Sequence, residues 1–137
     1  METLECIRTR RSIRKYLDKT VGMHLIGQIL EAGRMAPTAG NLQNYKFILV
    51  REAPIRRAIA EAAHQQYWME QAPVHIVVVA EPQRARQFYG ERGEKLYSIQ
   101  NCAAIVENML LAAHDLGLGA CWVGAFDDEM LRKALGI

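Results

Sequence analysis

The sequence feature that most constrains the fold is one long segment, near residues 94–116, whose apolar side chains recur at helical spacing. Its apolar stripe consists of Leu96, Ile99, Ala103, Val106, Leu110 and Ala113, and is widened by Cys102, Met109 and Leu116. A helix with so wide an apolar stripe needs other elements to cover it. We therefore expect this helix deep in a core or at a subunit interface, with Gly117 as its C-cap.

The rest of the chain predicts short strands and helices around this helix. The clearest strand is residues 75–80, which are β-branched and uncharged after the first residue, and further strands are expected at 47–50 and 120–123. Helices are expected up to about residue 10, near 23–35, from Pro54 to about 63, at 83–89, and from a cap at Asp127 or Asp128 to Gly136, with Gly90 and Gly93 marking a loop. This order predicts an α+β layered fold in one domain, residues 1–137.

Charge and cysteine content exclude several classes of protein. A formal net charge of +2 is too small for a general nucleic-acid or anionic-membrane binder. Cys6, Cys102 and Cys121 have long, unrelated spacings, which form neither a zinc motif nor a disulfide framework. The N-terminus carries charges where a signal peptide needs an apolar run, and no apolar run is long enough to span a bilayer. We therefore expect a cytoplasmic protein without a metal site.

Cationic side chains gather near the N-terminus, at Arg10, Arg11 and Arg14. The planar donor fork of arginine matches phosphate oxygens, and the hydroxyl of Ser12 adds another donor. In an extended segment Arg10, Ser12 and Arg14 would face the same side. The cluster therefore predicts a phosphate site, and the alternative is a solvated, charged helix end with no ligand.

A polar turn at residues 37–43 predicts the other end of a ligand site. The side-chain amides of Asn41 and Gln43 can both donate and accept hydrogen bonds, and Gly40 permits a positive φ or a close backbone approach. Such a turn suits the edge of a heterocycle that bears alternating donors and acceptors. An ordinary helix-to-strand loop is the alternative.

A third candidate segment follows the predicted strand at residues 120–123, where Gly124 leaves backbone N–H groups open to a ligand. The alternative is a strand-end turn without a ligand. No nucleophile triad or metal cluster stands out to compete with these segments. Together they suit a ligand with a phosphate at one end and a flat heterocycle at the other.

These segments, in this order, resemble the nitroreductase family of flavoproteins. The resemblance is carried by residues 10–16, 36–43, 71–74, 108–114 and 117–126, so it spans nearly the whole chain. It implies a central, mainly antiparallel sheet flanked by helices, and an intertwined homodimer that binds FMN between its subunits. The chain departs from the family pattern at Asn44-Tyr45, where many members have Pro-Trp, and we expect it to lack the family's C-terminal strand and tail.

The resemblance also implies a role for each candidate residue. Arg10, Ser12 and Arg14, with Arg11 beside them, would hold the phosphate and ribityl chain of FMN. Residues of the opposite subunit would line the flavin ring, namely Pro37, Thr38, Ala39 and Asn41, supported by Gln43. Val123 and Gly124 would direct backbone N–H groups at the reactive flavin nitrogen. Since the flavin carries the chemistry, no catalytic side chain is expected.

The activity implied by the resemblance is electron transfer from NADH or NADPH, through FMN, to a nitroaromatic, a quinone or a similar small acceptor by a ping-pong mechanism. The choice of nicotinamide and the physiological acceptor stay open. One alternative is other flavin chemistry on this fold, such as dehalogenation or azoline oxidation, and another is a non-catalytic flavin-binding dimer. The short 83–93 segment, where relatives with the other chemistries carry lid insertions, favours the reductase.

Overall fold

We describe a computed structural model of the whole chain, residues 1–137. At its centre β1 (Tyr45–Val50) and β2 (His75–Ala80) form a two-stranded antiparallel sheet, with Tyr45 opposite Ala80 and Val50 opposite His75. The α-helices are α1 (Thr3–Thr9), α2 (Met23–Arg34), α3 (Ala53–Ala62), α4 (Pro82–Arg92), α5 (Ser98–Asp115) and α6 (Asp128–Leu135). Short 3-10 helices η1 (Ala39–Asn41) and η2 (Tyr67–Gln71) and a π-helix, η3 (Gly93–Tyr97), complete the chain. The expected α+β class is confirmed.

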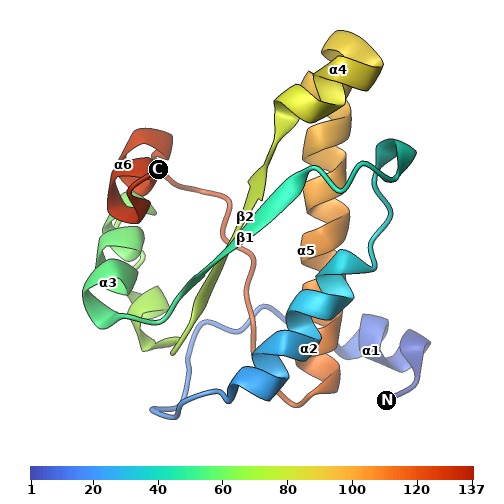
Figure 1. Ribbon diagram of the computed structural model, residues 1–137. Helices are drawn as coiled ribbons and strands as arrows, with labels where there is room; N and C mark the ends of the chain where they lie inside the picture. The colour runs from blue at the N-terminus through green and yellow to red at the C-terminus, as the bar shows by residue number, and fades with distance from the viewer.

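Helices cover both faces of the sheet, with α2 and α5 on one side and α3 and α6 on the other (Figure 1). Side chains alternate between the faces along each strand. Tyr45 and Phe47 of β1 therefore pack against α2 and α5, whereas Ile48 and Val50 pack against α3. A two-stranded sheet is only marginally stable alone, so these helices stabilise it.

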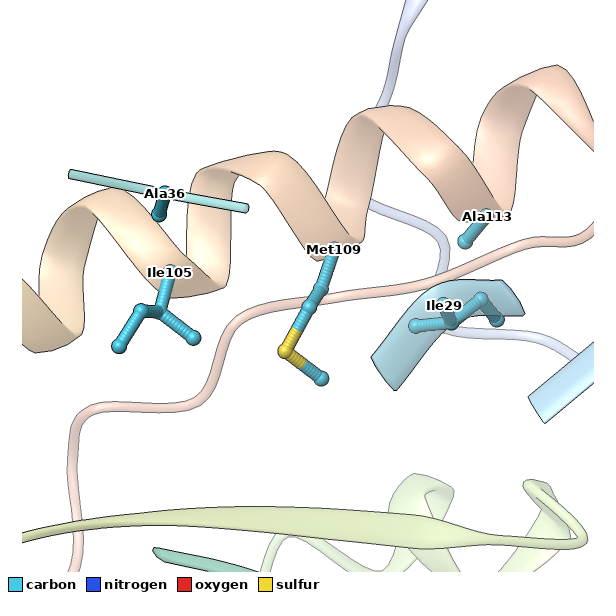
Figure 2. Packing of buried hydrophobic residues seen from close by; sticks show 5 residues of the cluster. All are labelled: Ile29, Ala36, Ile105, Met109 and Ala113. Carbon is cyan, nitrogen blue, oxygen red and sulfur yellow. The ribbon is translucent and has the colours of Figure 1, made fainter. Parts of the chain in front are cut away.

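The buried face of α5 differs from the predicted apolar stripe. It is formed by Ser98, Asn101, Ile105, Met109, Leu110 and Ala113. Leu110 and Ala113 are buried as predicted, but Ile99 is 66% exposed and Leu96 is 36% exposed. Figure 2 shows Ile105 and Met109 pointing from α5 toward the sheet. The prediction was wrong at the start of the helix because the polar residues Ser98 and Asn101 occupy its buried face. The spacing of apolar residues cannot indicate a buried polar position.

The loop predicted at Gly90 and Gly93 is confirmed only as a kink at Gly90, because the chain is otherwise helical from α4 through η3 into α5. Gly90 breaks the helix locally with a φ of +63°. Gly93 is buried, and a Cβ there would collide with the carbonyl oxygen of Ala85. Gly93 therefore allows α4 and η3 to pack closely, and it does not mark a turn.

Replacing Gly93 by alanine should lower the free energy of unfolding by about 1–3 kcal/mol, because the added methyl group meets backbone that cannot rotate away. Chemical denaturation measures this loss. The matched control is Gly27→Ala in α2, where a Cβ would meet nothing within 4 Å. That variant should be more stable than the parent by about 0.5–1 kcal/mol, since alanine favours a helix interior. A neutral Gly93→Ala variant would contradict the packing described for η3.

Residues 120–123, predicted as a third strand, form none. Their only ladder contact is one parallel bridge between Ala120 and Ser12, in which the Ile13 N–H donates to the Ala120 carbonyl over 3.0 Å. These residues are part of the connecting segment that runs from the end of α5 to α6 (Figure 1). A β-branched and aromatic composition indicates a preference for sheets, but a strand forms only where a partner strand lies alongside.

Local signals correctly predicted the ends of α5 and α6 and the starts of α3 and α6. Gly117 follows α5 with a φ of +79°, and Gly136 follows α6 with a φ of +72°. Of the two candidate caps of the last helix, Asp127 is the N-cap, because its Oδ1 accepts the Met130 N–H over 2.8 Å. Pro54 lies in the first turn of α3. None of the helices combines the length and the apolar composition that crossing a membrane requires.

Candidate functional site

The N-terminal candidate segment lies against the chain that follows α5. The Ile13 N–H donates to the Ala120 carbonyl over 3.0 Å. A Cβ on Gly119 would lie only 2.9 Å from Cγ2 of Ile13, so glycine is needed for this close approach. On the preceding helix, the buried Cys6 donates through Sγ to the Leu111 carbonyl over 3.3 Å. These contacts fix residues 10–14 near the C-terminal end of α5.

A small cavity of about 120 Å³ opens beside this segment. It is lined by Thr9, Arg10, Arg11, Ile13, Leu110, His114, Leu118 and Ala120. Both arginines already have partners within the chain. Arg10 Nε lies 3.6 Å from Oε1 of Glu107, and Arg11 Nη1 donates to the carbonyls of Arg8 and Arg10 over 3.1 Å and 2.9 Å. An anion that entered the cavity would have to share these guanidinium groups.

Ser12 and Arg14 are exposed and, unlike Arg10 and Arg11, have side chains without a polar partner in the chain. No ion pair or hydrogen bond within the chain uses the Ser12 hydroxyl or the Arg14 guanidinium, whose central carbon lies 5.8 Å from the centre of the Trp68 ring. Tyr16 also stacks on Trp68, with 6.4 Å between ring centres, and donates its hydroxyl to the Ile13 carbonyl. Burial raises the pKa of Tyr16 to about 12, so it remains a neutral donor near pH 7.

The polar turn has the positive φ that the sequence permits at Gly40, and it also has a positive φ at Asn41 and Gln43, which the sequence did not indicate. The φ angles of Gly40, Asn41 and Gln43 are +58°, +55° and +51°. Thr38 holds the turn together, since its carbonyl accepts the Asn41 N–H over 2.9 Å and its hydroxyl accepts the Gln43 N–H over 3.1 Å. The Tyr89 hydroxyl packs directly against Gly40, whose positive φ favours a glycine at this position.

The turn presents polar groups to solvent. Asn41 and Gln43 are exposed, and Gln43 Nε2 lies 3.5 Å from Asn41 Oδ1. Pro37 is exposed as well, whereas Thr38 and Ala39 are half-buried. The predicted residues of this segment therefore form one local surface that can donate and accept hydrogen bonds.

A buried polar cluster behind the turn was missed by sequence reasoning. It consists of Asn44, Ser98 and Asn101, which are 1%, 2% and 6% exposed. The Ala39 N–H of the turn donates to Oδ1 of Asn101 over 3.1 Å. The one sequence signal for this cluster is that Ser98 and Asn101 are three residues apart, and so lie on one side of a helix.

Val123 and Gly124 provide open backbone donors. Val123 is half-buried and packs against the cluster that contains Val50 and Ile59, while Gly124 is exposed and a Cβ there would meet nothing within 4 Å. No backbone hydrogen bond within the chain uses either N–H group. The segment is anchored just beyond, where the Asp127 N–H donates to the Ala62 carbonyl over 2.8 Å.

One copy of the chain does not bring all the predicted residues together. The turn meets α5 at Asn101, whereas Thr9, next to the arginine segment, meets it at His114. These positions are 13 residues apart in one helix, which is about 20 Å along its axis. Residues 10–14 thus lie beside residues 119–120, and the turn lies toward the other end of α5 (Figure 1).

The model of the Nitroreductase family matches residues 7–68 and 60–137 of this chain. A provisionally named NADH dehydrogenase/NAD(P)H nitroreductase of Archaeoglobus fulgidus is 39% identical over 98% of this chain and 74% of its own length. One of the same name from Methanothermobacter thermautotrophicus is 38% identical over 94% of this chain, which spans 64% of that relative. A crystal structure of a provisionally named nitroreductase from Desulfovibrio desulfuricans, in complex with FMN, is 36% identical with a TM-score of 0.86, over 98% of this chain and 76% of the other.

Proposed function

The chain belongs to the Nitroreductase family, and from this premise we propose that it is an FMN-dependent oxidoreductase that moves electrons from NADH or NADPH to a small organic acceptor. The names of its relatives support the nicotinamide and the class of reaction, and the FMN complex of a similar structure supports the cofactor. The finer steps that follow are proposed from the residues of this chain.

The observation that carries the proposal is a set of polar groups with no partner in the chain, on segments that suit FMN. Ser12 and Arg14 offer a hydroxyl and a guanidinium to a phosphate, and Val123 and Gly124 offer N–H groups. Exposed amides on the turn complement a pyrimidine edge. This donor set fits FMN, because it can bind an anion at one place and a flat ring with donors and acceptors at another.

In the proposed mechanism the protein binds and orients, and no side chain acts as a nucleophile. Bound FMN would supply the redox chemistry, namely hydride uptake from the nicotinamide and electron delivery to a second substrate, in two half-reactions at one cleft. Arg14 and Ser12 hold the phosphate end, and the Asn41 amide holds the edge of the ring. The unpaired N–H groups of Val123 and Gly124 would act as fixed donors that stabilise the negative charge of the reduced ring.

We further propose that the site is completed in a homodimer, with the arginine segment of one copy facing the turn of its partner. Only 21 of 137 residues are buried in one copy, although half of the composition is apolar. Exposed apolar side chains include Leu4 and Ile7 of α1 and Ile99 of α5, at 67%, 51% and 66%. A partner that covers Leu4, Ile7 and Ile99 explains why these apolar side chains lie open in one copy.

The decisive experiment separates binding from the two half-reactions. We expect purified protein to bind one FMN per chain, in a species of twice the chain mass by sedimentation. NADH or NADPH without acceptor should bleach the flavin absorbance, and a quinone added afterwards should restore it. Steady-state rates should then give parallel double-reciprocal lines for the two substrates. Protein that binds no FMN, or bound FMN that neither nicotinamide reduces, would contradict the proposed function.

A further inference from the structure

The polar cluster behind the turn is a continuous chain of hydrogen bonds among buried side chains and backbone groups. Asn101 Nδ2 donates to Asn44 Oδ1 over 2.9 Å, and Asn44 Nδ2 donates to the Ser98 hydroxyl over 3.1 Å and to the Glu81 carbonyl over 3.2 Å. The Ser98 hydroxyl donates onward to the Gly93 carbonyl over 3.0 Å. The cluster therefore joins β1, the end of β2, η3 and α5 around two buried side-chain amides.

The orientation of both amides is dictated by the two ends of this chain of hydrogen bonds. The Glu81 carbonyl can only accept, so Asn44 must turn Nδ2 toward it and Oδ1 toward Asn101. Asn101 must then present Nδ2 to Asn44, which leaves its Oδ1 for the Ala39 N–H. That backbone group can only donate, so the two ends agree and neither amide can flip without loss of a hydrogen bond.

The turn depends on this contact more than an ordinary loop would. Asn41 and Gln43 have positive φ angles, which cost little for asparagine but are unfavourable for glutamine. From outside the turn, only two hydrogen bonds reach residues 38–43. One is the half-buried contact from Ala39 to Asn101, and the other is a 3.4 Å contact from Arg84 to the Gln43 carbonyl at the exposed surface.

We propose that Asn101 is a positioning residue for the flavin ring, with Asn44 as the group that fixes the direction of its amide. This inference rests on the proposed function, because it assigns the turn at residues 38–43 to the ring of FMN. Asn101 acts through the turn. Its Oδ1 holds the Ala39 N–H and so sets where the Asn41 side chain and the backbone of the turn meet the heterocycle.

The test compares Asn101→Ala with Asn108→Ala by titration of flavin fluorescence. Asn108 is the matched control, because it lies on the same helix and its Nδ2 donates to a backbone carbonyl, that of Ala32, over 3.0 Å, away from the turn. Asn101→Ala should weaken FMN binding by about tenfold, as expected for one lost hydrogen bond and a donor left without its partner. Riboflavin, which shares the ring and lacks the phosphate, should lose the same factor.

Two further readouts distinguish positioning from a general loss of stability. The visible circular dichroism of bound flavin should change in Asn101→Ala and stay unchanged in Asn108→Ala. Asn101→Asp keeps an acceptor for the Ala39 N–H but loses the donor to Asn44, so it should unfold at a lower temperature and still bind FMN within about threefold of the parent. An affinity loss that follows the unfolding temperature across all three variants would overturn the inference.

Three other outcomes would also overturn the inference. Unchanged FMN affinity in Asn101→Ala overturns the positioning role and leaves the proposed function intact. Equal losses in Asn101→Ala and Asn108→Ala overturn it as well, because the effect would then not come from the turn. If the parent protein binds no FMN, both the proposed function and this inference are wrong.

Discussion

Replacing Arg14 by alanine is expected to weaken FMN binding on the order of 10- to 100-fold, while riboflavin binding stays nearly unchanged. A charge-assisted hydrogen bond to a phosphate contributes about 1.5–3 kcal/mol, which corresponds to that range. Among the three arginines of the segment, Arg14 is the one whose guanidinium is free to bind a phosphate, because it only stacks on Trp68. Arg10 pairs with Glu107, and Arg11 donates to backbone carbonyls. Fluorescence titration with both flavins measures the effect.

The control for Arg14 is Arg57→Ala, which removes another exposed arginine that also lies over an aromatic ring, that of Tyr67 at 5.2 Å. Arg57 is bound to Glu61 and Glu70 on the surface of α3 and η2, so its loss should leave the affinity for FMN unchanged. If Arg14→Ala weakens FMN and riboflavin equally, Arg14 contacts the ring and the phosphate assignment is wrong. An unchanged affinity for both would place Arg14 outside the site.

Elements with local signals could be predicted from the sequence. The β-branched run at residues 75–80 coincides with β2, the apolar spacing near residues 23–35 with α2, and the expected cap Asp127 begins α6. In each case the deciding physics lies within a few residues of the segment itself: side-chain periodicity, a capping oxygen or a proline in a first turn. The family resemblance, carried by ordered short motifs, is confirmed by the comparisons.

The errors have a common origin in packing and pairing contacts that local composition does not reveal. Residues 120–123 have the composition of a strand but no partner strand beside them. Gly93 was predicted to be a loop residue, but it is a packing residue, because any side chain there would collide with the carbonyl of Ala85 in α4. Asn44 and Asn101 are 57 residues apart, so nothing in the chain order reveals that their amides bond. Burial and pairing of this kind are set by the tertiary fold.

The candidate site was predictable in its residue types and not in its geometry. The sequence indicates cations, a hydroxyl and amides, and the structure shows that Ser12 and Arg14 are open while Arg10 and Arg11 have partners. One copy of the chain keeps the arginine segment and the turn at residues 37–43 near opposite ends of α5. That the two segments meet across a dimer therefore stays a prediction.

The largest effect on stability is expected from Ile105→Ala, which should lower the free energy of unfolding by about 2–5 kcal/mol. Ile105 is fully buried, and it points from α5 into the cluster formed with Ile29, Ala36, Met109 and Ala113 (Figure 2). Truncation removes apolar contacts and leaves a cavity that Phe47 and Val78 of the sheet cannot fill without moving. Chemical denaturation at a fixed protein concentration measures the loss.

Ile99→Ala removes the same atoms from the same helix and tests which face of α5 is the core. Ile99 belongs to the stripe that periodicity predicts, but it is 66% exposed, so its truncation should cost less than about 1 kcal/mol in the separated protomer. A larger loss that grows with protein concentration is the sign of a partner covering this face, because association stabilises by mass action. Equal, concentration-independent losses in Ile99→Ala and Ile105→Ala would mean that α5 is rotated from the orientation described here, with its predicted stripe turned inward.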